Sequence, residues 1–540
     1  MSSKSNPLGT VISPDLVDPR RRWAGALTRA SYLCVPIILF IISLYFRPSM
    51  YSDSGFGFLA LRSMLEGGAF NKITAPDPAN IANDVTSFLT WWSPGQYLVP
   101  GAFVWLGADY GLALSLTVLI STVIGVIGWG QVARSFDVNS SVFFVFLFGL
   151  VTFRYATLPF RIYNGGEVLL FAVAPWSLYW LRTSVNKTAA VCFAISLLSA
   201  VLLFVAKLTG MVVFVANVLA ISMLEVMRQR RLTSSVAFMW IASGIGTLCF
   251  LVFWLSRGGV PAGGSEFAVS WGAIWSSVSG AAFSGFSVQD LGRWLLLHRS
   301  SPILSDLTPI IYVLGPLGLI LMIAVWFGLR NTRYRAMAIT LFAIMAFYMA
   351  AITAMNVLKA PVGFGERHLR YAGILFFLLL LVAVDHWHVP VVKGLAMAGV
   401  GAFAVYGLIS YANGARELME RRYYDPLSGT SQMIVSPMVL EYLRSEVTRH
   451  NWKRAIALLP SPEAAIGLPR FRIIATHLDF TPLEIIASQT WAGRAEKIYV
   501  IVQERMLENG KAEALLKSFA NYEYGAWSQL KMDGMVVYSQ

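Results

Sequence analysis

Apolar runs of about twenty residues, nearly free of charge, recur through most of this chain and constrain its fold more than any other feature. A run of this length crosses a bilayer as an α-helix, because a helix satisfies its own backbone hydrogen bonds inside the hydrocarbon core. Hydrophobic residues make up 56% of the 540 residues and charged residues only 13%, which excludes an ordinary soluble protein. We therefore predict a polytopic α-helical membrane protein.

Charges between the runs predict the direction of each span. Lys and Arg concentrate in alternate short loops, as they do in cytoplasmic loops, and several Arg residues precede the first run, which carries no cleavage site. Residues 1–30 are therefore expected to be cytoplasmic and residues 31–411 to form a transmembrane domain in the inner (cytoplasmic) membrane of the cell. About eleven spans are expected, at 31–47, 110–132, 141–158, 167–182, 189–206, 209–227, 234–256, 308–329, 336–356, 371–386 and 391–411.

Two long loops, residues 47–107 and 256–309, are expected on the external side. In the first loop, Phe58, Leu61 and Leu65 share one face of a helix predicted from Gly55 to Glu66, and such a helix would lie along the membrane surface. The interpretation adds a second interfacial stretch near residues 81–89 and, in the second loop, an interfacial helix near residues 288–298.

The last part of the chain, residues 412–540, alternates short hydrophobic runs with charges, which predicts a small α/β domain. An odd number of spans places this domain outside the cytoplasm. The chain has three cysteines, all inside apolar runs, so neither a disulfide framework nor a thiolate metal site is expected. Helices are predicted at 438–448 and 511–520, and strands at 454–459, 471–475, 497–503 and 535–539.

Two acidic residues lie where the apolar runs meet the external side. Asp53 follows the first run directly, and a carboxylate at this depth is a candidate for proton transfer. The structural alternative is that Asp53 or Ser52 caps the helix that begins near Gly55. Glu167 stands at the outer start of the fourth span after two glycines, which allow close approach of backbone or substrate, although an acid at a helix start is also favoured by the helix dipole.

Basic residues also occur at the external ends of spans, where the positive-inside rule does not require them. If they converge, they could bind a phosphate or diphosphate whose lipid tail remains in the membrane. The alternative is that each one snorkels or pairs with a lipid headgroup or with an acid such as Glu366. These residues are Arg154, Arg161, Lys207, Lys359, Arg367, His368 and Arg370.

The order of these features resembles the GT-C superfamily of membrane glycosyltransferases, which use polyprenyl-phosphate-linked sugars as donors. The resemblance rests on the acid after the first span in Tyr51-Ser-Asp-Ser-Gly55, on the surface helices expected in the first external loop, on Glu167, and on the late basic segment Arg367-His-Leu-Arg-Tyr371. It implies that Asp53 is the general base of an inverting displacement and that Glu167 is a second catalytic residue. It also implies that the donor phosphate is bound by Arg161, Lys207, Arg367, His368 and Arg370.

The resemblance implies a polyprenyl-phosphate sugar donor, a glycan, lipid or protein acceptor, and no cofactor. Ser54 follows Asp53 where some relatives have a second acid, which disfavours a two-carboxylate metal site there and leaves open a metal shared by Asp53 and Glu167. The net charge of +13 is scattered among hydrophobic segments, so no nucleic-acid partner is expected. Two alternatives remain: a transporter or flippase for a lipid-linked glycan, and an O-antigen polymerase or ligase.

Overall fold

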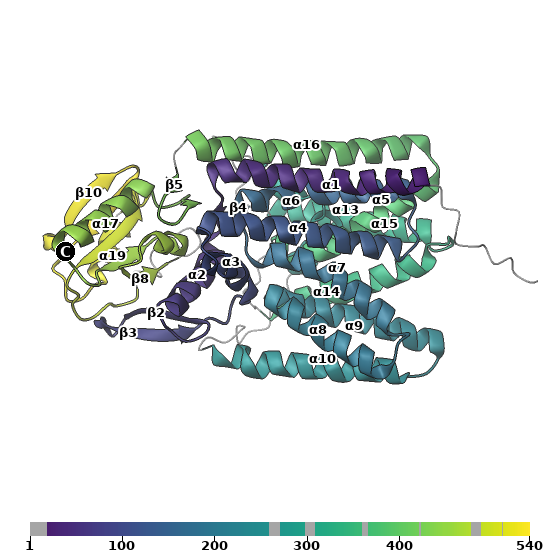
Figure 1. Cartoon of the computed structure of the whole chain (residues 1–540), viewed down its shortest axis with the longest axis horizontal. Coiled ribbons are helices and arrows are strands. Elements are labelled where there is room, and N and C mark those ends of the chain that lie inside the picture. Colours follow the sequence, from purple (N-terminus) through teal and green to yellow (C-terminus); the bar gives the residue numbers. More distant parts are fainter. Residues whose placement is uncertain are drawn as a thin grey trace, which may run out of the picture.

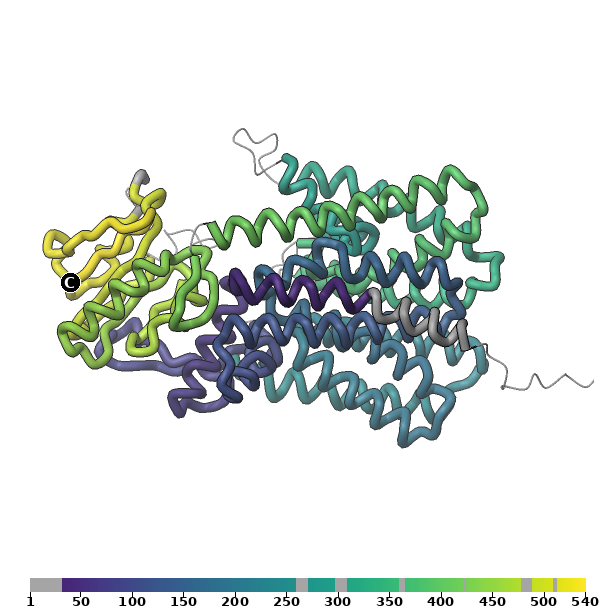
Figure 2. Tube along the Cα trace, turned by 45° about the horizontal axis from the view of Figure 1, so that its top comes forward, coloured from purple at the N-terminus to yellow at the C-terminus, as the bar shows by residue number. Residues whose placement is uncertain are grey.

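The computed structural model describes residues 19–258, 271–296, 308–358, 365–420, 423–476, 488–509 and 511–540. Part of the expected cytoplasmic segment (1–18), parts of the second external loop (259–270 and 297–307) and Lys359 lie outside the described residues. A bundle of long helices and a smaller domain with a sheet lie end to end (Figure 1 and Figure 2). Helix α1 begins at the end of the bundle that is remote from this smaller domain (Figure 1).

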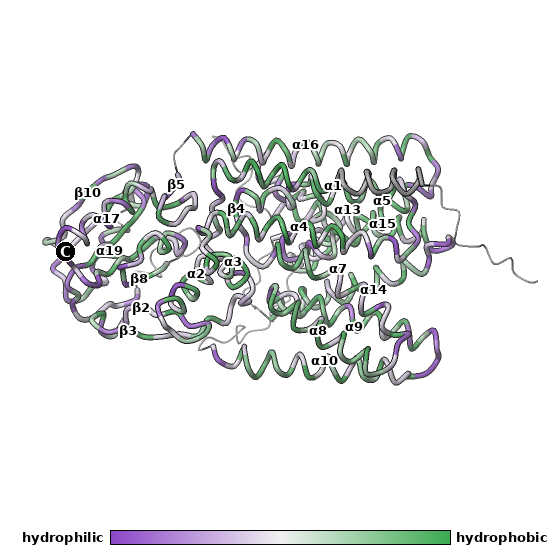
Figure 3. The backbone as a smooth tube through the Cα atoms, viewed as in Figure 1, coloured by the Kyte–Doolittle hydropathy of each residue, from purple (hydrophilic) through white to green (hydrophobic). Residues whose placement is uncertain are grey.

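Each expected span coincides with a helix. Within the described ranges, eight helices are long and apolar enough to cross a membrane, and a pair bent by 50° at Phe153 makes a ninth when it is counted as one span. Hydrophobic residues make up most of the length of these helices and hydrophilic residues gather toward their ends (Figure 3), so the multi-pass membrane fold is confirmed. The helices are α1 (Pro19–Phe46), α4 (Tyr110–Arg134), α5 (Ser140–Thr152), α6 (Arg154–Thr157), α7 (Gly166–Ser184), α8 (Ala189–Ala206), α9 (Leu208–Gln229), α10 (Ser234–Phe253), α13 (Thr308–Leu329), α14 (Arg335–Val357), α15 (Arg370–Trp387) and α16 (Pro390–Glu420).

Burial separates the central helix from the lipid-facing ones. In the segment that contains α15, 78% of the apolar window is buried, compared with 17% for the segments of α10 and α16. A helix that is apolar all round and buried lies inside a bundle, whereas one that exposes its apolar side chains needs lipid around it. The α15 helix therefore forms the middle of the bundle, and it carries the late basic segment on its leading end.

The first long loop, residues 47–107, which was expected to be external, folds into a layer between the bundle and the smaller domain (Figure 1). It contains α2 (Ser52–Leu65), a hairpin of β2 (Lys72–Asp77) and β3 (Asn80–Phe88), and α3 (Gly95–Trp105). Two predictions are corrected here. The stretch near residues 81–89 is a strand of this hairpin. Helix α2 packs against α3 and, at Gly55 and Arg62, against the turn η4 (Pro462–Gly467). Protein buries Phe58 and Leu61 of the face that was expected to meet the membrane surface, whereas Leu65 stays exposed.

The described part of the second external loop also contains helices. Helix α12 (Val288–Leu296) matches the expected interfacial helix as far as Leu296. Helix α11 (Trp271–Phe283) has no counterpart in the sequence prediction, and it packs against α13 and α15. This part of the loop therefore belongs to the bundle.

The small α/β domain is present and is built on a five-stranded sheet in the order β10-β11-β9-β7-β8. Helix α17 (Pro437–His450) covers one face through Leu440 and Leu443, and α19 (Lys511–Lys517) covers the other through Leu515. The domain begins later than expected, because α16 continues to Glu420. The strands are β7 (Ile456–Leu459), β8 (Arg472–Ala475), β9 (Ile498–Gln503), the unpredicted β10 (Ser528–Met532) and β11 (Met535–Ser539), with β7 parallel to β8 and β9 and the other pairs antiparallel.

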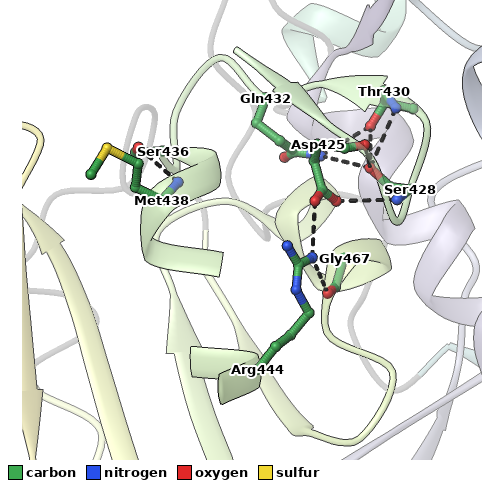
Figure 4. Close-up of polar contacts among 8 residues, drawn as sticks. All are labelled: Asp425, Ser428, Thr430, Gln432, Ser436, Met438, Arg444 and Gly467. Atoms are coloured by element: carbon green, nitrogen blue, oxygen red, sulfur yellow. Dashed lines mark hydrogen bonds and ion pairs between the residues drawn. The ribbon is translucent and has the colours of Figure 1, made fainter. Parts of the chain in front are cut away.

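A buried carboxylate ties the entry segment of this domain to its helices. Asp425 is fully buried; its Oδ1 accepts a hydrogen bond from Arg444 Nη1 at 2.9 Å, and its Oδ2 accepts one from the Ser428 amide at 3.1 Å (Figure 4). Arg444 also donates to the carbonyl of Gly467 at 3.0 Å, which is the end of η4. These three hydrogen bonds satisfy the Asp425 carboxylate and the Arg444 guanidinium, which would otherwise be costly to bury. The entry segment is thereby joined to the turn on which α2 rests.

Candidate active site

A short pair of strands brings the two predicted acids to the same place. Strand β1 (Ser49–Met50) lies parallel to β4 (Ile162–Tyr163), and the Tyr51 amide donates to the Tyr163 carbonyl at 2.9 Å. Helix α2 starts directly after β1, and α7 starts shortly after β4. The N-terminal ends of these two helices therefore meet, with Asp53 in the first turn of α2 and Glu167 in the first turn of α7.

Charged groups of alternating sign form a row at this meeting point. Arg367 Nη2 lies 2.9 Å from Asp53 Oδ2, and Arg367 Nε lies 4.0 Å from Glu167 Oε1. Lys207 Nζ lies 2.8 Å from the same Glu167 oxygen. The Glu167 and Lys207 side chains are only 13% and 14% exposed, whereas Asp53 is 31% exposed. The row thus runs from a buried ion pair to a carboxylate that ligands can reach.

The structure does not support a capping role for Asp53. The N-cap of α2 is Tyr51, and this cap has no side-chain hydrogen bond. The Asp53 carboxylate bonds to Arg367 instead. A negative charge in the first turn of a helix still has a favourable interaction with the helix dipole.

The cations reach the row from breaks between helices. Lys207 is an extended residue (φ −162°, ψ 145°) between α8 and α9, which directs its side chain toward Glu167. Burial lowers the pKa of Lys207, and the adjacent Glu167 carboxylate opposes that shift. Arg367 and His368 lie on the turn η3 (Glu366–Leu369), at the leading end of α15.

Glu366 holds this turn in place, a role that the sequence analysis missed. Its side chain is buried, and its two oxygens accept hydrogen bonds from the amides of Gln289 and Asp290 at 3.1 and 3.2 Å. These amides belong to the first turn of α12, where free N–H groups favour a carboxylate. The residue before Arg367 is therefore anchored to α12, a helix from the second long loop. The sequence carried no signal for this contact beyond the presence of an acid next to the basic residues.

A cavity of about 650 Å³ opens beside the charged row. Its volume lies within the range that holds a small ligand. The buried atoms Gln96 Nε2, Asn164 Oδ1 and His368 Nδ1 have no hydrogen-bond partner among the described residues, and all three residues line the cavity or its rim. Buried polar atoms are almost always paired, so a polar ligand would complete these three. The polar lining includes Tyr51, Asp53, Ser93, Gln96, Asn164, Glu167, Lys207, Thr209, Arg367 and His368, and the apolar lining includes Trp91, Trp92, Leu208, Met211, Val212, Phe250, Leu255 and Met355.

Two predicted phosphate-binding residues lie apart from this cavity. The Arg161 guanidinium packs against Gly414 of α16, where no side chain competes for the space, and burial together with the Arg154 cation lowers the pKa of Arg161. Arg370 lies 5.1 Å above the Tyr155 ring and 4.0 Å from Glu366, and it lines a smaller adjoining pocket of about 40 Å³. The structure therefore gathers Asp53, Glu167, Lys207, Arg367 and His368, and their chemical roles remain predictions.

No metal site stands out in the described part of the chain, where no three His, Cys, Asp or Glu side chains gather. Asp53 and Glu167, the two acids that could share a metal, have the Arg367 guanidinium between them. The expectation that no cofactor takes part stays a prediction.

Comparisons with known proteins bear on the fold. No protein-family model and no curated protein sequence matches this chain. Among solved structures it is similar to ArnT from Cupriavidus metallidurans in the apo state, at 13% identity and a TM-score of 0.51, over 97% of this chain and 98% of ArnT. It is likewise similar to that ArnT bound to undecaprenyl phosphate, at 12% identity and a TM-score of 0.50, over 94% of this chain and 97% of ArnT. A likeness over almost the whole of both chains shows that this chain shares the fold of ArnT, and the predicted membrane bundle of helices with a small C-terminal α/β domain is confirmed.

Proposed function

We propose that this protein is a glycosyltransferase that moves a sugar from a polyprenyl-phosphate donor to an acceptor hydroxyl. The observation that most supports it is one cavity that joins an accessible carboxylate, two cations and an apolar wall. A lipid-phosphate sugar has an anionic group for the cations, hydroxyls for the unpaired polar atoms and a hydrocarbon chain for the apolar wall. ArnT, which shares this fold, has been crystallised with undecaprenyl phosphate.

The residues suggest one direct displacement. Asp53 accepts the proton of the acceptor hydroxyl while that oxygen attacks the anomeric carbon of the sugar. The bond between this carbon and the phosphate oxygen breaks, and the lipid phosphate leaves from the opposite face with the bonding electron pair. The anomeric centre is thereby inverted. Charge builds on the leaving phosphate in the transition state, where Lys207 and Arg367 stabilise it more than in the ground state.

Arg367 has to change partners for this reaction. Its guanidinium contacts Asp53 in this structure. While it does so, the Asp53 oxygen accepts a hydrogen bond from Arg367 and is not available to take the proton of an acceptor hydroxyl. A donor phosphate competes with Asp53 for the same N–H groups, since phosphate accepts forked hydrogen bonds as a carboxylate does. Donor binding would then leave Asp53 free for the acceptor. Glu167, between Lys207 and Arg367, orients both cations.

We further infer that the reaction takes place at the extracytoplasmic face of the inner membrane. Helix α2, which carries Asp53 in its first turn, lies at the end of the bundle next to the C-terminal domain (Figure 1). Hydrophilic segments gather at the other end (Figure 3), where α7 and α9 end with Arg182 and Arg228 in their last turns. A carrier for lipid-linked glycans would be expected to hold its special residues near the middle of the membrane, on broken helices. Their position at one end favours a transferase.

The test is transfer by the purified full-length protein. It is incubated with a panel of polyprenyl-phosphate sugars, and release of polyprenyl phosphate is measured together with the glycosylated product. Asp53→Asn is expected to lower kcat by about 10²–10⁴-fold, the contribution of a general base, with no change in thermal unfolding. Asp77→Asn, in a turn whose Oδ1 bond an asparagine can keep, is the matched control. Full activity of Asp53→Asn with every donor that the native protein uses would remove Asp53 from the mechanism.

A further inference from the structure

A second large cavity lies at the opposite end of the bundle from Asp53. Its volume is about 730 Å³. Helices α4, α7 and α9 end beside it and α14 begins there, and each of these helices has its other end toward the charged row or the C-terminal domain. The proposed transfer reaction does not use this cavity.

Three arginines and one glutamate line this cavity, which leaves an excess of positive charge. Arg182 Nη1 donates to the carbonyl and hydroxyl of Ser135 at 2.8 and 2.6 Å and thereby joins α7 to the end of α4. Arg228 Nη2 contacts Glu225 at 2.8 Å, and its side chain remains 58% exposed. The Arg134 guanidinium lies over the Phe143 ring, 4.8 Å from its centre. Arg134 and Arg228 are thus the two cations of the cavity that take no part in the Arg182–Ser135 contact between α7 and α4.

The cavity also has an apolar side, which indicates what kind of anion could bind there. Ile221, Leu224 and Ile339 provide an apolar side beside the arginines. The ends of three helices meet there, and their C-terminal dipoles repel an anion unless cations outweigh them. Arginines at the membrane boundary attract anionic lipids and can bind a phosphate group with forked hydrogen bonds. An amphiphilic ligand with a phosphate and a hydrocarbon part matches both sides of the cavity.

We infer that this cavity binds the phosphate headgroup of an anionic membrane phospholipid, in the leaflet opposite to the proposed transfer site. This site goes beyond the proposed function, because its ligand is a bulk phospholipid and not the sugar donor. It would be occupied whether or not the protein transfers sugar.

The experiment measures binding of dioleoyl phosphatidylglycerol to the delipidated full-length protein by native mass spectrometry. Dioleoyl phosphatidylcholine, which carries no net charge, is expected to bind more weakly. Arg134→Gln/Arg228→Gln should weaken phosphatidylglycerol binding about thirtyfold, as expected for two cations near a membrane surface. Arg330→Gln/Arg335→Gln removes the same charge at the same end outside the cavity lining and should leave the affinity unchanged.

Two further measurements separate the possible results. Glycerol phosphate, a soluble compound with the same anion, should bind much more weakly than the lipid. Equal affinity would mean that the cavity binds a free phosphate compound and not a lipid, which would overturn the proposal. Equal phosphatidylglycerol binding by both double variants, or an equal loss in both, would also overturn it. Thermal unfolding confirms that each variant is folded, and Arg182→Gln provides a second cavity variant.

Discussion

The ion pair between Lys207 and Glu167 allows a quantitative test of how the charges at the cavity depend on one another. Glu167→Gln removes the carboxylate that faces Lys207 at 2.8 Å and Arg367 at 4.0 Å. Arg367 still has Asp53 at 2.9 Å. Lys207 has no second acid within ion-pair distance in the described ranges, so its ammonium group is left buried without a countercharge.

The size of the effect follows from this asymmetry. Removing one partner of a buried ion pair costs about 3–5 kcal/mol, because the remaining charge keeps its desolvation penalty. We expect Glu167→Gln to lie at the lower end, about 3 kcal/mol, since the cavity gives water some access. Lys207→Met should cost less, because Glu167 keeps Arg367. The double variant removes both charges and should recover about 1–3 kcal/mol relative to the sum of the two single changes.

Thermal unfolding of the detergent-solubilised protein measures these differences, with tryptophan fluorescence as the signal. For a chain of 540 residues, a loss of about 3 kcal/mol lowers Tm by about 3 °C. Glu513→Gln breaks an exposed pair with Lys517 and serves as the control, with no measurable change in Tm expected. The reasoning is refuted if Glu167→Gln is as stable as the native protein, or if Lys207→Met is the more damaging of the two.

Three other changes test the packing and the site. Gly55→Val would place a Cβ 2.6 Å from a backbone nitrogen of η4, so we expect a loss of about 1–3 kcal/mol and faster proteolysis of the C-terminal domain, which Gly399→Val, at an open position, should not show. Arg472→Ala removes hydrogen bonds to the β2–β3 hairpin and should speed amide exchange in residues 72–88; unchanged exchange would contradict this contact. Arg367→Lys keeps the charge without the fork, so the donor KM should rise about tenfold, and an unchanged KM would argue against phosphate binding by Arg367.

The bundle could be predicted from the sequence because a bilayer admits few structures. Charge-free runs of membrane length have to be helices, and every expected span coincides with one. The same reasoning fails for α2, because an apolar helix face does not say whether lipid or protein will cover it. In the structure, Tyr163 and α3 pack against Phe58 and Leu61 of this face, and η4, some four hundred positions later in the chain, packs against the neighbouring face at Gly55. The hairpin β2–β3 was missed for a similar reason, since its partners come from within the loop and from that distant domain.

The site could be predicted only as separate parts. Asp53 and Glu167 were singled out by their depth, but the strands that bring them together have two residues each and leave no pattern to detect. Arg161 and Arg367 both looked suited to bind phosphate, yet one packs against a glycine of α16 and the other lies between the two acids. Position along the chain reports depth in the membrane, whereas the direction of a side chain depends on neighbours far away in sequence.

The charge balance of the row explains how such a site can exist in the absence of substrate. Two carboxylates and two cations cancel, so the row carries no net charge and each of its charged groups has a partner of opposite sign. A bound phosphate would add negative charge and accept hydrogen bonds from the N–H groups of Arg367, the cation that has two acidic partners. Lys207 has only Glu167, and that pair is nearly buried, so it would stay in place. Exchange at Arg367 would then release Asp53, the more exposed acid, and the carboxylate would become available when the donor is present.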